Sequence, residues 1–584
     1  MSFFLCINKC ILFSYHFFQD IEDMKTECGL FAALAIKNKI MPDTVYNALA
    51  SIQHRGQDSW GLLIFNYNEL TDDRKQGLFP LSVEEISALK LMVHIEMPYF
   101  VIGHLRYATA KLVTTPTSTT SSFTEKITNS LKRFSLSGGR SSSNLTASVS
   151  SIDSNSTSID ENPLLSIQPV EISKEHCIYI AHNGNLANLR YNVGKLNVNS
   201  RLIYPTDTYL FKYIWEEEFS YNGTRDEIVE FIKHIIKNIP GAYSCVLSFY
   251  DKKTGIYSLF GFRDRYGYKP LSIGIVDRNN SEVGGEVGGA VDSGSYCFFS
   301  ESVQLSDNCE FLGDVEPGAI YEIAGSAKGM TQQPKCIYKY YGPDMVKKPF
   351  FCSMEAIYFM DKGTKLFNGI TTVHHFRFKL GMALAKQEYS RDFGIMDKMK
   401  KSVITYVPES AHSIAAGYAA FFCRNEASDL ITKVENIRSF IESSTDSRNG
   451  KIKRKFAFNE EKIVKIDEIV LIDDSIVRGN TMIFIIKKLK EINPEIKIHL
   501  RIGAPMITDE CHFGIDIASR DELVYTSSSP FAPSADTIRH YLGAASLEFL
   551  DVKIMEELFA SYGSGACTYC FGSRDLPNEK CLDW

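Results

Sequence analysis

The length, composition and charge of the chain exclude several classes of protein. It has 584 residues, which favours two domains with insertions because a single hydrophobic core rarely grows that large. Its hydrophobic fraction of 44% and charged fraction of 23% are those of a globular protein. A net charge of −7 offers no general attraction to nucleic acid or to an anionic membrane, so we expect neither as a partner. Fourteen cysteines are too dilute here for a disulfide scaffold.

No segment of the sequence reaches the roughly 18 to 20 unbroken apolar residues that span a bilayer. Residues 1–18 come closest, but Asn8, Lys9 and His16 interrupt them. They also lack the basic start and the small-residue cleavage site of a secretory signal. We therefore interpret residues 1–27 as a propeptide or a mis-assigned start, and Met24 could itself initiate the chain.

The first half of the chain alternates apolar positions with Gly and Asn breaks, which is the pattern of short strands. A strand is predicted at 28–36 and a helix around 43–54. Further strands are predicted at 100–107, 178–182, 244–250 and 271–276. Together they predict layered, mostly antiparallel sheets.

Two segments interrupt this pattern. Residues 111–165 are dominated by Ser, Thr and Asn, and such a segment buries too little apolar surface to offset the entropy of ordering. We predict a disordered insertion there, and we favour a solvated loop over a phosphorylation site. Residues 277–295 contain two Gly-Gly pairs, which predicts an enlarged hairpin loop.

Beyond about residue 350, predicted helices and strands alternate. The helices are expected at 373–389, 413–422 and 481–492, and the strands at 402–407, 469–472 and 496–502. This alternation predicts an α/β domain with a parallel sheet.

Three short segments of the first half carry candidate chemistry. Cys28 places a thiol at the start of a strand, beside a glycine that lets a substrate approach. Arg106 offers a cation at a strand end, suited to a carboxylate. Asn183 and Gly184 offer the N–H donors that an oxyanion needs. Taken singly, each has an ordinary structural explanation as a buried thiol, a surface cation or a turn, but chance rarely produces all three in this order.

The run IVLIDDSIVRGNT at 469–481 is the most specific motif of the chain. A buried strand ends in Asp473 and Asp474, and a loop of mainly small residues then opens a helix. The carboxylates could hold ribose hydroxyls and Mg²⁺, while the loop N–H groups and the helix start could hold a phosphate. The alternative is that two acids simply cap a helix.

These motifs resemble known families. The first half resembles the glutaminase domain of class II, N-terminal-nucleophile (Ntn) amidotransferases. The matching runs are ECGLF at 27–31, QHRGQD at 53–58, GHLRYAT at 103–109, HNGNL at 182–186, PGAYS at 240–244, RDRYGYKPL at 263–271, SES at 300–302 and PG at 317–318. The run at 469–481 resembles the phosphoribosyl pyrophosphate loop of type I phosphoribosyltransferases, in the form found in amidophosphoribosyltransferases.

The resemblance implies a fold and domain boundaries. Residues 28–345 would form an α+β Ntn glutaminase domain, layered αββα, interrupted by the two insertions. Residues 346–520 would form an α/β type I phosphoribosyltransferase domain with a parallel sheet, and 521–584 a C-terminal helical segment.

The resemblance also implies residue roles in the glutaminase half. Cys28 would be the nucleophile and its own α-amine the base, since an α-amine has a pKa of about 8 against about 10.4 for Lys. Asn183 and Gly184 would stabilise the oxyanion, Arg106 would bind the glutamine carboxylate and Asp207 its amino group. The chain departs from the family at Thr208-Tyr209, where Ser-Glu is usual, and at Lys269, where Arg is usual.

In the second half, the implied phosphoribosyl pyrophosphate site comprises Asp473, Asp474, Ser475, Val477, Arg478, Gly479, Asn480 and Thr481. Ser410, within Val-Pro-Glu-Ser, would join Asp473 and Asp474 at Mg²⁺. Residues 360–364 and 433–437 differ from the family pattern beside this site, which bears on how the site excludes water.

The implied reaction is glutamine plus phosphoribosyl pyrophosphate plus water to 5-phosphoribosylamine, glutamate and pyrophosphate, the first committed step of purine synthesis. It implies a cytoplasmic enzyme, a homodimer or homotetramer, with purine nucleotides as feedback inhibitors.

The Cys567-x-x-Cys570 pair is by itself compatible with redox chemistry, zinc binding or neither. A subgroup of the family carries an iron–sulfur cluster on four widely spaced cysteines, and Cys352, Cys511, Cys567 and Cys570 match their contexts. We favour a [4Fe–4S] cluster over free thiols, with zinc third.

Two alternatives remain at this point. Other class II amidotransferases, such as the glucosamine-phosphate, asparagine or glutamate synthase types, lack an acidic-pair phosphoribosyl loop. A degenerate paralogue that binds nucleotides and regulates a partner would explain the altered 360–364 and 433–437 segments, but the retained Cys28, Arg106, Asn183, Asp473 and Asp474 argue against it.

Overall fold

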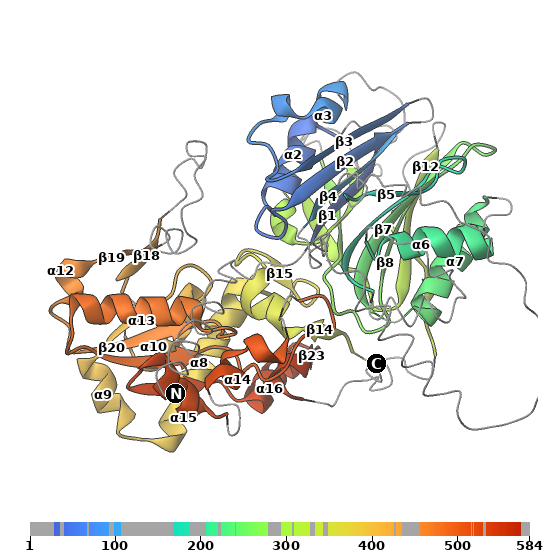
Figure 1. Ribbon diagram of the computed structural model, residues 1–584. Coiled ribbons are helices and arrows are strands. Elements are labelled where there is room, and N and C mark those ends of the chain that lie inside the picture. Colours follow the sequence, from blue (N-terminus) through green and yellow to red (C-terminus); the bar gives the residue numbers. More distant parts are fainter. Residues whose placement is uncertain are drawn as a thin grey trace, which may run out of the picture. The chain divides into compact units, whose positions relative to one another are not determined.

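The computed structural model describes most of the chain from Cys28 to residue 573 (Figure 1). The described residues are 28–35, 40–66, 69–92, 99–106, 167–186, 206–219, 223–239, 241–277, 294–305, 309–326, 333–342, 348–424, 428–434, 456–515, 517, 519–528 and 533–573. They belong to one compact unit of the chain. The segment predicted at 1–27, the insertion at 111–165 and most of the loop at 277–295 lie outside them.

The first half contains a seven-stranded antiparallel sheet in the order β11-β9-β10-β1-β4-β2-β3. Its strands are β1 (Gly29–Ala35), β2 (Ser59–Phe65), β3 (Leu70–Gln76), β4 (Tyr99–Arg106), β9 (Ser272–Val276), β10 (Ser295–Phe299) and β11 (Glu310–Asp314). The central β1, with the sequence GLFAALA, is buried at every position. The consecutive strands β9 and β10 pair with each other, as the predicted hairpin requires.

A second antiparallel sheet has six strands in the order β13-β12-β8-β7-β6-β5. They are β5 (Val170–Ser173), β6 (Ile178–Asn185), β7 (Ala242–Asp251), β8 (Ile256–Arg263), β12 (Ala319–Ser326) and β13 (Lys335–Lys339). The prediction of mostly antiparallel sheets in this half is confirmed.

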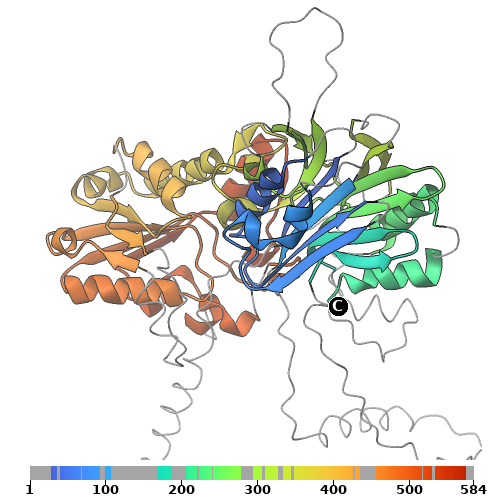
Figure 2. The same cartoon turned by 90° about the horizontal axis from the view of Figure 1, so that it is seen from above.

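Apolar side chains bind these sheets to each other and to helices. Leu30 and Phe100 of the first sheet pack with Val246 and Leu259 of the second. Other residues of the first sheet pack against α2 and α3, and other residues of the second pack against α6 and α7, which lie along that sheet in two views (Figure 1, Figure 2). The helices and short helical turns are α2 (Pro42–Ala50), η1 (Val83–Glu85), α3 (Ser87–Met92), α6 (Tyr209–Ile214), η3 (Trp215–Phe219), α7 (Arg225–Asn238) and η4 (Ser302–Gln304).

The second half is built on a four-stranded parallel sheet in the order β17-β20-β21-β22. Its strands are β17 (Val403–Tyr406), β20 (Glu468–Asp473), β21 (Lys497–Ile502) and β22 (Ser546–Phe549). Its helices are η5 (Glu355–Phe359), α8 (Val373–Arg391), α9 (Ile395–Lys401), α10 (His412–Phe421), α12 (Glu460–Ile463), α13 (Asn480–Ile492), η6 (Arg520–Glu522), α14 (Val524–Ser528), α15 (Ala535–Leu542), α16 (Val552–Ser561) and η7 (Tyr569–Phe571). The predicted parallel sheet is confirmed.

Helices cover both faces of this sheet because successive residues of a strand point to opposite sides. Val470 and Ile472 of β20 join the core of α8 and α10. Ile469 and Leu471 join the core of α13 and α15. From Ile469 to Ile472, β20 therefore reads as a continuous apolar run, and it ends at Asp473.

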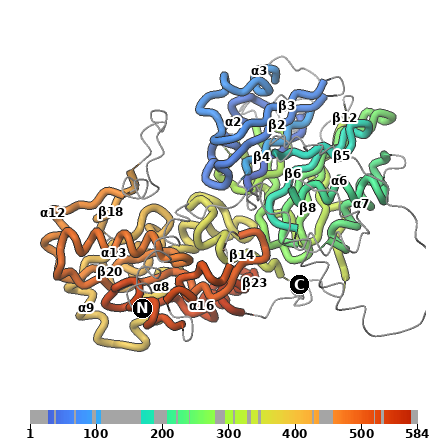
Figure 3. Tube along the Cα trace, in the orientation of Figure 1, coloured from blue at the N-terminus to red at the C-terminus, as the bar shows by residue number. Residues whose placement is uncertain are grey.

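The segment expected as a helical C-terminal extension, 521–584, also supplies β22 to the parallel sheet, so the sheet continues past residue 520. β23 (Gly565–Cys567) returns to pair with β14 (Phe350–Cys352), and the two lie side by side (Figure 3). Two further pairs are β15 (Lys365–Leu366) with β16 (Thr371–Thr372), and β18 (Ile431–Lys433) with β19 (Phe456–Phe458). Across the described part of the chain, we find no helix with the length and apolar character needed to cross a bilayer.

Candidate active sites

The antiparallel register of β1 and β4 brings two of the predicted residues to one end of the first sheet. The last registered pair is Gly29 with Leu105, so Cys28 and Arg106 follow at the same end of neighbouring strands. The Nε of Arg55 donates to the carbonyl of Cys28 at 3.0 Å. This bond fixes the backbone at the start of β1.

β6 of the second sheet supplies the predicted oxyanion donors. Asn183 is fully buried, and neither its Oδ1 nor its Nδ2 has a hydrogen-bond partner among the described residues. Gly184 has φ +136°, and a Cβ there would lie 1.9 Å from the carbonyl oxygen of Ala242, so only glycine fits. Because buried polar groups are normally paired, the amide of Asn183 is suited to a bound molecule.

His104 joins the two sheets at this end. It pairs with Leu30 in the β1–β4 register, and its Nε2 lies 3.2 Å from the carbonyl oxygen of His182. Burial lowers the pKa of His104 to about 3, with the charges of His182 and Arg106 acting in the same direction. His104 is therefore neutral at physiological pH and links β4 to β6.

Asp207 lies immediately before α6 and is held by its neighbours. One carboxylate oxygen accepts from the Leu186 N–H at 3.1 Å and lies 3.4 Å from His182 Nε2. The hydroxyl of Thr208 lies 3.0 Å from the other ring nitrogen of His182. Burial acts to raise the pKa of Asp207, but the nearby His182, the Leu186 N–H and Arg106 together hold it below its ordinary value. An ionised carboxylate suits an ammonium group, and Thr208, where the family usually has Ser, supports the histidine.

A buried ion network fastens the Cys28 end to the second half of the chain. Arg55, 1% exposed, donates to Glu301 at 2.6 Å and to both oxygens of Glu355 on η5 at 3.0 and 3.1 Å. Lys269 lies 3.7 Å from Glu355, which places two cations against two carboxylates. Burial acts to raise the pKa of Glu301, but His54 and Arg55 hold it well below its ordinary value. Glu301 therefore stays ionised in the folded protein.

The family-divergent segment at 360–364 belongs to this network. The Asp361 N–H and the Thr364 hydroxyl donate to the second oxygen of Glu301 at 2.8 and 2.7 Å. The altered residues thus satisfy a buried carboxylate.

Removing one member of the network should destabilise the fold strongly, because a buried charge loses its partner. We expect Glu355→Ala to lower the free energy of unfolding by about 3–5 kcal/mol, measured as the midpoint of urea unfolding. Asp397→Ala is the matched control: it removes an exposed carboxylate that pairs with Lys400 at 2.9 Å, and its midpoint should not move. Equal midpoints for both variants would contradict the role given to the network.

In the second half, the acidic pair stands at the carboxyl end of β20. Asp473 and Asp474 are 8% and 3% exposed. The carboxylate of Asp474 accepts from the hydroxyls of Ser410 and Ser475. Burial raises the pKa of Asp474, against the effect of both serines and of Arg377. The structure thus brings Ser410, from the segment after β17, to the acidic pair, and these oxygens are the ligand type that Mg²⁺ prefers.

The loop after the pair leads into α13. Gly479 has φ +81° at the helix N-cap, a conformation that favours glycine. Arg478 forms an ion pair with Glu522 at 2.9 Å, and the Val477 carbonyl accepts from the Val524 N–H at 2.7 Å. The segment 475–481 is anchored at its middle and leads into the N-terminus of α13, the end of a helix that favours anions.

Arg377 connects this loop to the ion network. Its guanidinium donates to the carbonyls of Ala356 and Met360, at the two ends of η5, at 2.9 and 2.8 Å. Burial lowers the pKa of Arg377 to about 10, while the charges of Asp474 and Glu301 act to raise it. Arg377 therefore interacts electrostatically with one carboxylate of the acidic pair and one of the ion network.

The four candidate cluster cysteines are neighbours. Cys352 and Cys567 are directly paired residues of β14 and β23. Burial raises the pKa of Cys570 well above its ordinary value, and Cys511, Cys567 and Cys352 add to this shift. Among the described residues, no three His, Cys, Asp or Glu side chains lie close enough to hold a single metal ion. The four thiols nevertheless share one buried region.

No model of a known protein family matches the chain. Curated relatives do match it over nearly its full length. An amidophosphoribosyltransferase of Drosophila melanogaster is 27% identical over 97% of this chain and 92% of the relative. Those of Archaeoglobus fulgidus and Bacillus subtilis are each 26% identical, over 95% and 96% of this chain and 99% and 96% of the relatives. The similarity is to amidophosphoribosyltransferases.

Solved structures show a likeness of fold. The Bacillus subtilis glutamine phosphoribosylpyrophosphate amidotransferase complexed with ADP and GMP aligns with a TM-score of 0.64 at 24% identity, covering 95% of this chain and 100% of the other. The structure of the allosteric regulatory enzyme of purine biosynthesis gives 0.63 at 24% identity, covering 95% and 99%. The two-domain fold expected from the motifs is therefore the fold of these amidotransferases.

Proposed function

We propose that the chain is a glutamine-dependent amidophosphoribosyltransferase, which converts glutamine, phosphoribosyl pyrophosphate and water into 5-phosphoribosylamine, glutamate and pyrophosphate. The observation that carries this function is the presence in one chain of two sites: the Cys28 site between antiparallel sheets and the acidic pair at the end of parallel strand β20. The similarity to amidophosphoribosyltransferases over both halves supports it. Glutamine-dependent release of pyrophosphate from phosphoribosyl pyrophosphate tests it, and no release would refute it.

In the glutaminase site, the Cys28 thiol attacks the glutamine amide carbon and its own α-amine takes the thiol proton. The amide oxygen becomes an oxyanion that the side chain of Asn183 and the N–H of Gly184 stabilise. The α-amine returns the proton to the leaving ammonia, and water then hydrolyses the thioester to glutamate. Arg106 holds the substrate carboxylate and Asp207 its ammonium, each by a charge-assisted hydrogen bond.

This mechanism requires cleavage between Glu27 and Cys28, because an α-amine forms at Cys28 only when that peptide bond is broken. We expect N-terminal sequencing of the active native protein to begin Cys-Gly-Leu-Phe. A fully active protein that begins at Met1 or Met24 would require another base for Cys28.

In the phosphoribosyl site, ammonia adds at ribose C1 as pyrophosphate leaves. Asp473 and Asp474 bind ribose hydroxyls, and the N–H groups of 475–481 with the start of α13 hold the 5-phosphate. The donor set fits Mg²⁺: the buried Asp474 carboxylate accepts from the hydroxyls of Ser410 and Ser475 and forms no salt bridge among the described residues. Mg²⁺ held by Ser410, Asp473 and Asp474 would neutralise charge on the leaving pyrophosphate.

We propose that Cys352, Cys511, Cys567 and Cys570 hold a [4Fe–4S] cluster. The donor set fits, since four thiols gather in one buried region and a cluster spreads its ligands more widely than a single ion does. Such a group would tie β14, β23 and the Cys511 segment together.

The protein purified without air should therefore contain about four iron atoms and four sulfides per chain. Cys570→Ser should lose this iron and unfold more easily, whereas Cys423→Ser, at an exposed cysteine, should retain it. Finding one zinc and no iron would reverse the assignment.

We also propose an Ntn domain of layered αββα form at 28–345, and a phosphoribosyltransferase domain from 346 that includes β22. A homo-oligomeric, cytoplasmic enzyme follows from the proposed family. The complex of the Bacillus subtilis structure with ADP and GMP supports purine nucleotides as feedback inhibitors here.

A further inference from the structure

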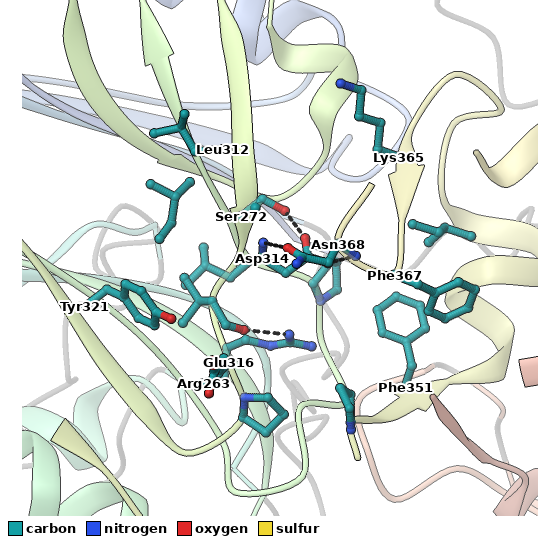
Figure 4. Close-up of a pocket in the computed structure, with 18 of the residues that line it drawn as sticks. Arg263, Ser272, Leu312, Asp314, Glu316, Tyr321, Phe351, Lys365, Phe367 and Asn368 are labelled. Carbon is teal, nitrogen blue, oxygen red and sulfur yellow. Dashed lines mark hydrogen bonds between the residues drawn. The ribbon is translucent and has the colours of Figure 1, made fainter. Parts of the chain in front are cut away.

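A cavity of about 600 Å³ lies apart from both candidate active sites, and none of their residues lines it (Figure 4). β9, β11 and β12 form one side of it, and the segment of β15 and β16 the other. Its volume is within the range of about 300–1,000 Å³ typical of sites for small ligands.

A buried arginine supplies the most specific feature of this cavity. Arg263 is 3% exposed and lines it. Its two terminal nitrogens donate to the carbonyls of Val315 and Gly267, at 2.9 and 2.5 Å. Its Nε has no hydrogen-bond partner among the described residues. Figure 4 shows the guanidinium reaching toward the middle of the lining side chains. A buried donor of this kind is normally paired, so the cavity offers a position for an acceptor.

The acidic side chains of the lining already have partners. One oxygen of Asp314 accepts from the Ser272 hydroxyl at 2.7 Å and the other from the Asn368 N–H at 2.6 Å. Glu316 pairs with Lys339. Among the described residues Arg263 forms no salt bridge, and burial lowers its pKa, while the charges of Asp264, Asp314 and Glu355 act to raise it.

The walls are suited to a flat apolar body. Phe367 stacks on Tyr562 at 5.3 Å between ring centroids and meets Phe351 edge-on at 6.1 Å. Tyr321 and Leu312 face the cavity from the other side (Figure 4). Aromatic walls with one positioned polar group are the usual composition of a small-molecule site.

We propose that this cavity binds a small aromatic anion, with its carboxylate or phosphate on the Nε of Arg263 and its ring against Phe351 and Phe367. This third site does not depend on the proposed enzyme activity.

Calorimetric titration of the full chain with four probes tests this site: 2-naphthoate, 1-naphthyl phosphate, the neutral 2-naphthamide, and acetate. We expect one or both naphthyl anions to bind with one site per chain, and the tighter one identifies carboxylate or phosphate as the preferred group. 2-Naphthamide and acetate should each bind at least about tenfold more weakly than the better naphthyl anion. The amide lacks the charge-assisted hydrogen bond, and acetate lacks the ring contacts. Equal binding of 2-naphthoate and 2-naphthamide would overturn the role of Arg263.

Because Arg263 variants lose two hydrogen bonds to backbone carbonyls that support the fold, exposed positions give the sharper test. Ile370 lines the cavity and is 67% exposed. Ile370→Asp should weaken the naphthyl anions several-fold by like-charge repulsion and leave the amide unchanged. Leu78→Asp, at a position 61% exposed and outside the lining, should change neither. Unaltered anion binding in Ile370→Asp, or displacement of the anion by saturating glutamine or phosphoribosyl pyrophosphate, would overturn the site.

Discussion

Replacing Cys28 by Ala should lower the glutamine-dependent rate at least about a thousandfold, because the thiol is the only nucleophile proposed for the glutamine amide. Turnover with a high concentration of an ammonium salt should stay within about twofold of wild type, since free ammonia bypasses the glutaminase site. The measurement is pyrophosphate release from phosphoribosyl pyrophosphate with each nitrogen donor in turn.

Cys336→Ala is the matched control for this variant. Cys336 is exposed, and its thiol donates to the carbonyl of Tyr338. It should behave as wild type with both donors. If Cys28→Ala lost both activities equally while its unfolding midpoint stayed normal, Cys28 would have to serve the sugar site and the division of labour would be wrong.

Local patterns in the sequence predicted the central elements closely. The strand predicted at 469–472 is β20, Glu468–Asp473, and the helix predicted at 373–389 is α8, Val373–Arg391. β20 is buried from Ile469 onward, so its sequence is a short unbroken apolar run of the kind that marks a buried strand. The helix predicted to 54 ends at Ala50, and the turns that follow direct Arg55 into the ion network.

Edge strands escaped prediction for a physical reason. β3 has the sequence LTDDRKQ, half exposed at the edge of its sheet. Edge strands commonly carry charged residues, which discourage pairing with other chains, so such a sequence has no apolar alternation to detect. β22 is only four residues long, and its pairing with β21 becomes visible only in the fold.

The supporting residues of the sites were also beyond local patterns. Arg55 and Glu355 are 300 residues apart in the chain, and no spacing rule connects them. His182 and Thr208 lie next to motif residues, but their contact with each other depends on how β6 meets the segment before α6. Reading the residues beside each motif as candidate supports would have identified His104 and His182, though not their partners.

Replacing both Asp473 and Asp474 by Asn should abolish product formation with either nitrogen donor. The loss should again be at least about a thousandfold, since both donors deliver ammonia to the same ribose carbon and the amides bind Mg²⁺ poorly. The glutaminase half provides an internal check, because hydrolysis of glutamine should remain measurable in the double variant.

Asp467→Asn is the matched control, because Asp467 is an exposed carboxylate just before β20, at the opposite end of the strand from the acidic pair. It should retain both activities. Asp474 is 3% exposed, and its amide replacement keeps nearly the same shape and can still accept from the hydroxyls of Ser410 and Ser475. The fold should therefore survive, and a normal unfolding midpoint would attribute the loss to the missing charges. Near-normal activity with ammonium in the double variant would contradict this assignment. The sugar site would then not depend on the two carboxylates at the carboxyl end of β20.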